Sequence, residues 1–204
     1  MARRVRPRPY LPLTTPARYD QLVRLGWRLG SAPALPIDEP INWEEPEAAL
    51  RSWFYHLQAL DPIEPALAQW SATGELPALE LAISVALDWV RAHADRTDPT
   101  DWPRVWYDMA TGMRAYRLSY LLEEARRAGL IAPEDEDRLL RLLQRHLELL
   151  IDEARFTAHS NHGFFQSAGL LALCRRVLRA QDRDAGVAVA TARLRTILET
   201  HFTA

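Results

Sequence analysis

Two adjacent polar residues, Asn161 and His162, interrupt the otherwise helical stretch ARFTAHSNHGFFQSAGLLAL. A carboxamide donates hydrogen bonds, and an imidazole accepts or gives a proton close to neutral pH. At the start of a helix, both side chains would lie beside free amide groups that favour an anion. This pair therefore suits a site that neutralises a carboxylate and moves a proton.

The same residues also have simpler interpretations. Asn161 alone suits a helix N-cap, with Gly163 relaxing the backbone. His162 alone suits a solvated loop histidine, or a core histidine with a hydrogen-bonded ring. His159 and His162 have a spacing that suits a shared metal ion, but the other histidines are scattered and the chain has no cysteine cluster. We therefore predict no metal site and no cofactor.

Helical patterns surround this break and would have to position it. Apolar residues recur with the period of an amphipathic helix in residues 46–60, 77–93, 98–129, 133–154, 164–181 and 184–202, and a shorter helix is predicted within 17–30. No segment alternates apolar and polar residues as a half-buried strand does. We therefore predict an all-α fold, with residues 1–40 as an N-terminal arm and residues 41–204 as a helical domain.

Capping residues mark the ends of several predicted helices. Thr100 or Asp101 would cap one helix, and Gly129 would end it. Acidic residues that follow Pro133 would stabilise the start of the next helix, where the dipole favours negative charge. Gly30 would end the short helix of the arm. Antiparallel helices with short links build a bundle, a solenoid or a toroid, and periodicity alone does not choose among them.

The composition narrows the classes of function. The chain has 204 residues, a net charge of -2, one cysteine and 25 basic residues, all of them arginine. Because basic residues are not in excess, we do not expect nucleic acid as a partner. Cys174 lies on an apolar stretch, which indicates a buried thiol. Prolines interrupt the basic start, and no run is apolar enough to span a membrane. We predict a cytoplasmic location by default, or a periplasmic or secreted one if a leader has been removed.

Three segments, taken in order, resemble one known family. They are NWEEPEAALRSWFYHLQAL, DWPRVWYDMATGMRAYRLSYLL and HSNHGFFQSAGLLAL. Together they resemble the N-terminal helical domain of the heparinase II/III-like polysaccharide lyases, a family that includes heparin, heparan-sulfate and alginate lyases. The resemblance extends from Ile41 to the C-terminus, and the ordered set carries it rather than any single motif.

The resemblance implies a partial (α/α) toroid of antiparallel helical hairpins and β-elimination at a uronic acid of an acidic polysaccharide. A donor stabilises the enolate-like transition state, a base removes the C5 proton and an acid protonates the leaving oxygen. By this resemblance the catalytic residues are Asn161, which would bind the uronate carboxyl, and His162, which would assist there or act as the base. Arg114 would bind acidic sugar groups, and Trp106 or Tyr107 would stack on a sugar face.

The chain departs from the family pattern near its end. In the family a catalytic tyrosine follows the Asn-His segment and a C-terminal β-sandwich contributes a histidine, whereas here no tyrosine follows Tyr120 and the sandwich is absent. We expect either a truncated lyase or a shortened homologue, with a missing C-terminal domain or a homo-oligomer partner as its complement. In both cases we expect little or no lyase activity from the chain alone.

Other interpretations of these residues remain open. Large aromatic residues are more often core than sugar platforms, and Trp53 and Trp89 are predicted in the core. Arg114 also suits an exposed pair with a carboxylate one turn away. The competing functions are a noncatalytic helical module that binds a glycan or a protein, and a glycoside hydrolase with two groove carboxylates about 5–10 Å apart.

Overall fold

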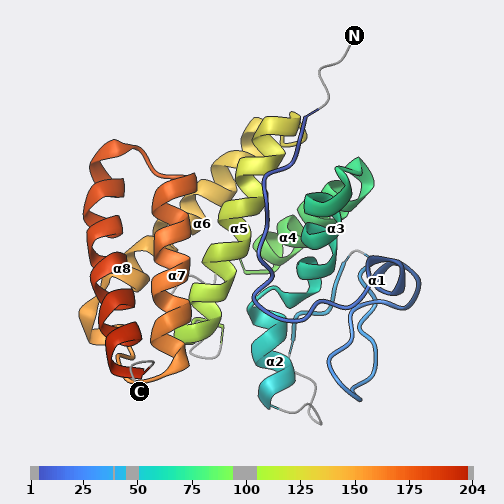
Figure 1. Cartoon of the computed structure of the whole chain (residues 1–204). Helices are drawn as coiled ribbons and strands as arrows, with labels where there is room; N and C mark the ends of the chain where they lie inside the picture. Colours follow the sequence, from blue (N-terminus) through green and yellow to red (C-terminus); the bar gives the residue numbers. More distant parts are fainter. Residues whose placement is uncertain (1–4, 39, 45–50, 94–104, 202–204) are drawn as a thin grey trace.

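The computed structural model shows a molecule built of α-helices (Figure 1). It describes residues 5–38, 40–44, 51–93 and 105–201. Within these residues the only β-type pairing is an isolated bridge between Trp27 and Leu35. The prediction of an all-α fold is confirmed. No helix in the described part of the chain is both long and apolar enough to cross a membrane.

Eight α-helices and two short 3₁₀ turns make up the described residues. They are α1 (Tyr19–Leu25), α2 (Arg51–Gln58), η1 (Asp61–Ile63), α3 (Glu64–Thr73), α4 (Leu76–His93), α5 (Asp108–Ala128), α6 (Pro133–Ile151), η2 (Glu153–Arg155), α7 (Asn161–Arg176) and α8 (Ala180–His201). Their apolar faces form the core, as the helical period predicts. Trp53, Trp89 and Cys174 are buried, which confirms the predictions made for these three residues.

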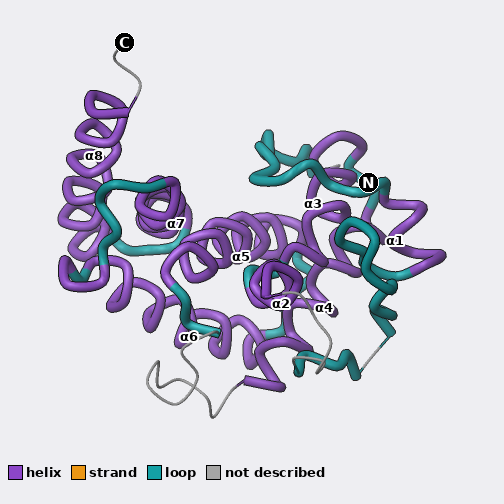
Figure 2. Tube along the Cα trace, turned by 90° about the horizontal axis from the view of Figure 1, so that it is seen from below, coloured by secondary structure: helices purple, strands orange, loops and turns teal. Residues whose placement is uncertain are grey.

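The last six helices form three antiparallel hairpins, α3–α4, α5–α6 and α7–α8 (Figure 1). At the ends of α3 and α5, Gly74 and Gly129 have left-handed φ angles of 72° and 69°, which glycine adopts at little cost. Helices α3, α5 and α7 run upward in Figure 1, and α4, α6 and α8 run back. The starts of α2, α5 and α7 therefore lie at one end of the molecule, and Figure 2 shows these helices side by side from that end.

Helix α5 begins later than the sequence predicts. It starts at Asp108, with Tyr107 as the N-cap residue. The predicted caps Thr100 and Asp101 lie outside the described residues, and residues 105–107 form a turn before the helix. The predicted exit at Gly129 is confirmed.

The short arm helix α1 ends earlier than predicted. Gly26, not Gly30, follows its last residue and has a φ of 81°. A Cβ at Gly26 would lie 2.2 Å from the carbonyl oxygen of Leu35, so the returning chain packs directly on this glycine. A tertiary contact therefore sets this helix end.

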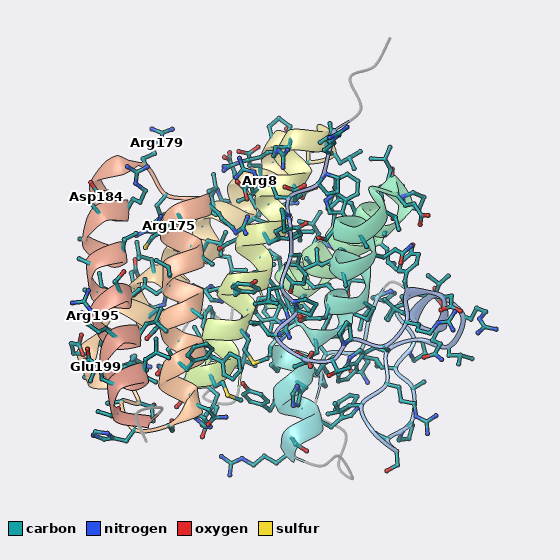
Figure 3. The ribbon with its side chains drawn as sticks, in the orientation of Figure 1. Arg8, Arg175, Arg179, Asp184, Arg195 and Glu199 are labelled. Atoms are coloured by element: carbon teal, nitrogen blue, oxygen red, sulfur yellow. The ribbon has the colours of Figure 1, made fainter. Side chains whose placement is uncertain are left out.

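The N-terminal arm packs along α5, with Arg8 on the face that Figure 3 shows toward the viewer. The Tyr120 hydroxyl donates to the carbonyl of Arg8 at 2.7 Å, and the Tyr116 hydroxyl donates to the carbonyl of Leu11 at 2.9 Å. The ring of Tyr10 lies 4.6 Å from that of Tyr120, centroid to centroid. The arm thus shares one hydrophobic cluster with the helices.

Candidate functional site

A cavity of about 820 Å³ lies where α2 meets the first turns of α5 and α7. Its lining residues are Arg51, Ser52, Phe54, Tyr55, His56, Tyr107, Met109 and His162. One guanidinium, two imidazoles and two phenol rings therefore line one space. A cavity of this volume is large enough for a small organic ligand.

His162 is held in the cavity wall by its own helix and by α5. The Ser160 hydroxyl accepts a hydrogen bond from the backbone N–H of His162 at 3.1 Å, which makes Ser160, and not Asn161, the N-cap of α7. Nδ1 of His162 lies 3.1 Å from both carboxylate oxygens of Asp108. The Thr157 hydroxyl donates to the same carboxylate at 2.8 Å.

The contact with Asp108 selects one form of the neutral imidazole. A carboxylate only accepts hydrogen bonds, so Nδ1 of His162 carries the hydrogen and Nε2 carries the lone pair. Nε2 makes no hydrogen bond to any described residue, and the side chain is 27% exposed. His162 therefore has the arrangement of a general base, with a carboxylate that orients the ring.

Glycine residues let α5 and α7 approach closely enough to form this pair. A Cβ on Gly169 would lie 2.1 Å from the carbonyl oxygen of Gly112. A Cβ on Gly163 would lie 2.3 Å from the carbonyl oxygen of Thr157. Both positions accept only a residue without a side chain. Gly163 thus lets the loop before α7 pack against the first turn of that helix, and this contact, rather than a relaxed backbone, requires glycine there.

A second imidazole–carboxylate pair lines the cavity from α2. Nδ1 of His56 lies 2.7 Å from Oδ2 of Asp61, and the His56 side chain is 25% exposed. Oδ1 of the buried Asp61 lies 2.6 Å from Nη2 of Arg117, which also pairs with Glu64. Burial alone lowers the pKa of Arg117, but the two carboxylates outweigh it and raise this pKa above its ordinary value. Two carboxylates and one guanidinium leave a net negative charge behind His56.

Aromatic rings connect the two imidazoles. The Tyr55 ring makes edge-to-face contacts with His56 at 5.2 Å and with Tyr107 at 6.1 Å between centroids. The Tyr107 ring continues the series to His162 at 5.7 Å, and the Arg51 guanidinium carbon lies 5.8 Å from the Tyr107 centroid. Burial raises the pKa of Tyr55, so its phenol stays protonated at neutral pH and does not act as a base.

The structure brings two of the five predicted site residues into the cavity wall. These are Tyr107 and His162. Asn161 is exposed near the cavity, with Nδ2 3.9 Å from Sδ of the lining residue Met109. Trp106 is 4% exposed and, like Tyr107, lines a neighbouring cavity of about 230 Å³.

Arg114 lies in the core, which corrects the prediction that it binds substrate. Its Nε donates to Nε2 of His146 at 2.9 Å, and its Nη1 donates to the carbonyl of Val105 at 3.0 Å. The guanidinium carbon also lies 4.5 Å and 5.0 Å from the ring centroids of Trp89 and Trp106. Burial lowers the pKa of Arg114 to about 9, so the side chain remains charged at neutral pH. With 0% exposure it offers no atom to a ligand in the cavity.

No sequence pattern indicated Arg51, His56 or Asp108 as a member of a site. His56 and Asp61 are five residues apart across the end of α2, a spacing that belongs to no common catalytic motif. The sequence pointed only weakly to Asp108: it follows the aromatic residue Tyr107 at a helix start, where a carboxylate can be held in a fixed orientation. Among the described residues no group of three side chains has the arrangement of a metal site.

No known protein family, curated protein or solved structure matches the chain. The comparisons therefore add nothing to the resemblance carried by the aromatic segments and the Asn-His-Gly motif.

Proposed function

We propose that the cavity binds a uronate unit of an acidic polysaccharide, and that His162 is the base of a β-elimination. One observation carries this proposal: His162, with Nδ1 held by Asp108, lines the same cavity as Arg51. The reaction needs a base next to a bound carboxylate, and a guanidinium is well suited to bind one.

The difficulty of this reaction lies in the second negative charge that develops beside the carboxylate. Arg51 would neutralise the carboxylate through two parallel hydrogen bonds. The amide groups and dipole at the start of α7 would further stabilise the enolate-like transition state. Asn161 would donate from the rim, in the role that the family resemblance implies. Tyr107 would offer its ring to a sugar face.

We also propose that the hairpins form part of an (α/α) toroid. Successive antiparallel hairpins are the building units of such a fold. The common direction of α3, α5 and α7, with α4, α6 and α8 running back, supports this arrangement (Figure 1). The cavity then lies at the end where the first helices of two hairpins, α5 and α7, begin.

A noncatalytic module that binds a glycan or a protein is the second candidate. The exposure of Asn161 and the burial of Arg114 and Trp106 favour it, because these three residues, which the lyase resemblance implies, do not line the cavity. A glycoside hydrolase is less well supported. None of the described residues that line the cavity carries a carboxylate, and His162 lines it instead of facing away.

Calorimetric titration with oligouronates tests the binding proposal. We expect the protein to bind them and Arg51→Gln to weaken binding at least tenfold, about 1.4 kcal/mol. Arg195→Gln is the matched control, because Arg195 lies on the outer side of α8 (Figure 3). The proposal is wrong if no oligouronate binds, or if both variants bind like the wild type.

A further inference from the structure

We infer that His56 is the acid that protonates the leaving glycosidic oxygen when His162 acts as the base. This inference rests on the proposed function. Both imidazoles line the same cavity, and each has its Nδ1 within hydrogen-bond distance of a carboxylate, Asp61 for His56 and Asp108 for His162. For both rings Nε2 makes no hydrogen bond to any described residue. The cavity therefore holds two oriented proton-transfer groups.

The helix positions of the two rings differ in the way that an acid and a base require. His56 lies in the last turn of α2, where the helix dipole favours a positive charge. His162 lies in the first turn of α7, where the dipole disfavours one.

The charged groups that surround the two rings also differ. His56 has Asp61 against it and Glu64 and Arg117 behind, which together carry a net negative charge. Among the described residues His162 has one carboxylate against it, that of Asp108, which also accepts a hydrogen bond from Thr157, and Arg51 lines the same cavity. Tyr55 and Tyr107, the phenols in contact with the two rings, add no charge while protonated.

The two groups together account for every proton of the elimination. Nε2 of His162 takes the proton from C5, and the C5–H electron pair forms the C4–C5 double bond. The bond between C4 and the glycosidic oxygen breaks, and that oxygen takes the proton from Nε2 of His56. The products are an unsaturated uronate and a free hydroxyl, with His162 charged and His56 neutral. Proton exchange with water restores both rings.

This assignment changes what is expected of the chain by itself. The sequence led us to expect little or no lyase activity, because the family tyrosine and the sandwich histidine are missing. With His56 as the acid, the described cavity contains both required groups. The 204-residue chain should then form unsaturated uronate slowly but measurably.

The test compares His56→Asn, His162→Asn and the exposed control His159→Asn. Asparagine places its amide nitrogen near the position of Nδ1, so it keeps the contact with the carboxylate and removes only Nε2. Elimination is followed by unsaturated uronate absorbance, and proton removal by deuterium incorporation at C5 in heavy water. Binding of the same oligouronates is measured by calorimetry.

We expect His56→Asn to bind normally and to exchange deuterium at C5, while elimination falls about 100-fold or more. A merely structural role for His56 would slow exchange and elimination together. His162→Asn should lose both activities, and His159→Asn neither. The inference is wrong if His56→Asn eliminates as fast as the wild type. It is also wrong if the wild-type chain binds oligouronates without eliminating. Neither result contradicts the proposal that the cavity binds a uronate. Failure of every oligouronate to bind overturns the proposed function itself.

Discussion

Gly112 of α5 and Gly169 of α7 touch through their backbones, since a Cβ on Gly169 would lie 2.1 Å from the carbonyl oxygen of Gly112. A side chain at Gly169 would have no space between the two helices. Asp108 and His162, 54 residues apart in the sequence, sit at the starts of these helices and meet at 3.1 Å. The glycine contact and the imidazole–carboxylate pair thus belong to the same close packing of α5 against α7.

The Gly169→Ala variant should lose about 2 kcal/mol or more of its free energy of unfolding, because the new methyl group has no space between the helices. Gly129→Ala is the control: nothing lies within 4 Å of its Cβ position, so only the left-handed backbone opposes it, at about 1 kcal/mol. Urea unfolding of both variants provides the measurement. Equal stability of Gly169→Ala and wild type would contradict the close packing of α5 and α7.

The Asp108→Asn variant should reduce elimination at least tenfold and leave oligouronate binding close to that of the wild type. The amide no longer selects the form of His162 with the hydrogen on Nδ1, so Nε2 less often carries the lone pair. Absorbance of unsaturated uronate and calorimetry give the two readings. Asp137→Asn, at an exposed position in the first turns of α6, should change neither. A loss of binding that matches the loss of elimination would indicate general damage to the cavity.

The Glu64→Ala variant should destabilise the protein by about 3–5 kcal/mol, because it leaves Arg117 buried with one carboxylate fewer. Glu64 also accepts hydrogen bonds from the Tyr10 hydroxyl at 3.1 Å and the Leu13 backbone at 2.6 Å, so its loss should release the arm. Thermal unfolding and limited proteolysis within the first 18 residues report the two effects. Glu80→Ala, at an exposed position of α4, should stay within about 0.5 kcal/mol of wild type. An arm equally resistant to protease in both variants would refute this role of Glu64.

Stability should fall in mild acid because His146 is buried neutral beside Arg114. Burial first, and then the charge of Arg114, lower the pKa of His146 well below its ordinary 6.5. Below pH 6.5 the unfolded chain takes up a proton that the folded protein does not. The free energy of unfolding is therefore unaffected by protonation of His146 above pH 6.5 and decreases as the pH falls below that value.

The His146→Gln variant keeps an acceptor for Arg114 and does not titrate. Below pH 6.5 its unfolding free energy should depend less steeply on pH than that of the wild type, by up to about 1.4 kcal/mol per pH unit. Chemical denaturation across this range measures the slopes. The exposed His159→Gln control should keep the wild-type slope, and identical slopes in all three proteins would refute the assignment.

Local patterns accounted for most of the helices. The apolar spacing in α2 and α4, the acidic start of α6 and the glycine exit of α5 each act over one or two turns. The starts of α5 and α7 were less accurately predicted. Tyr107 and Ser160, not the more obvious Asp101 and Asn161, precede these helices. Several residues that can cap a helix occur close together there, and residue type alone does not choose among them.

The amino-acid sequence alone determined that the protein is helical, that its tryptophans are largely buried and that a polar break at Asn161 and His162 precedes a helix. These properties depend on neighbours within a few residues. Only the tertiary structure decided that Arg114 belongs to the core and that His56, Arg51 and His162 share one cavity. Those relationships join different helices, with Arg114 contacting His146 across 32 positions and Asp108 contacting His162 across 54, and no local periodicity encodes which helix faces meet.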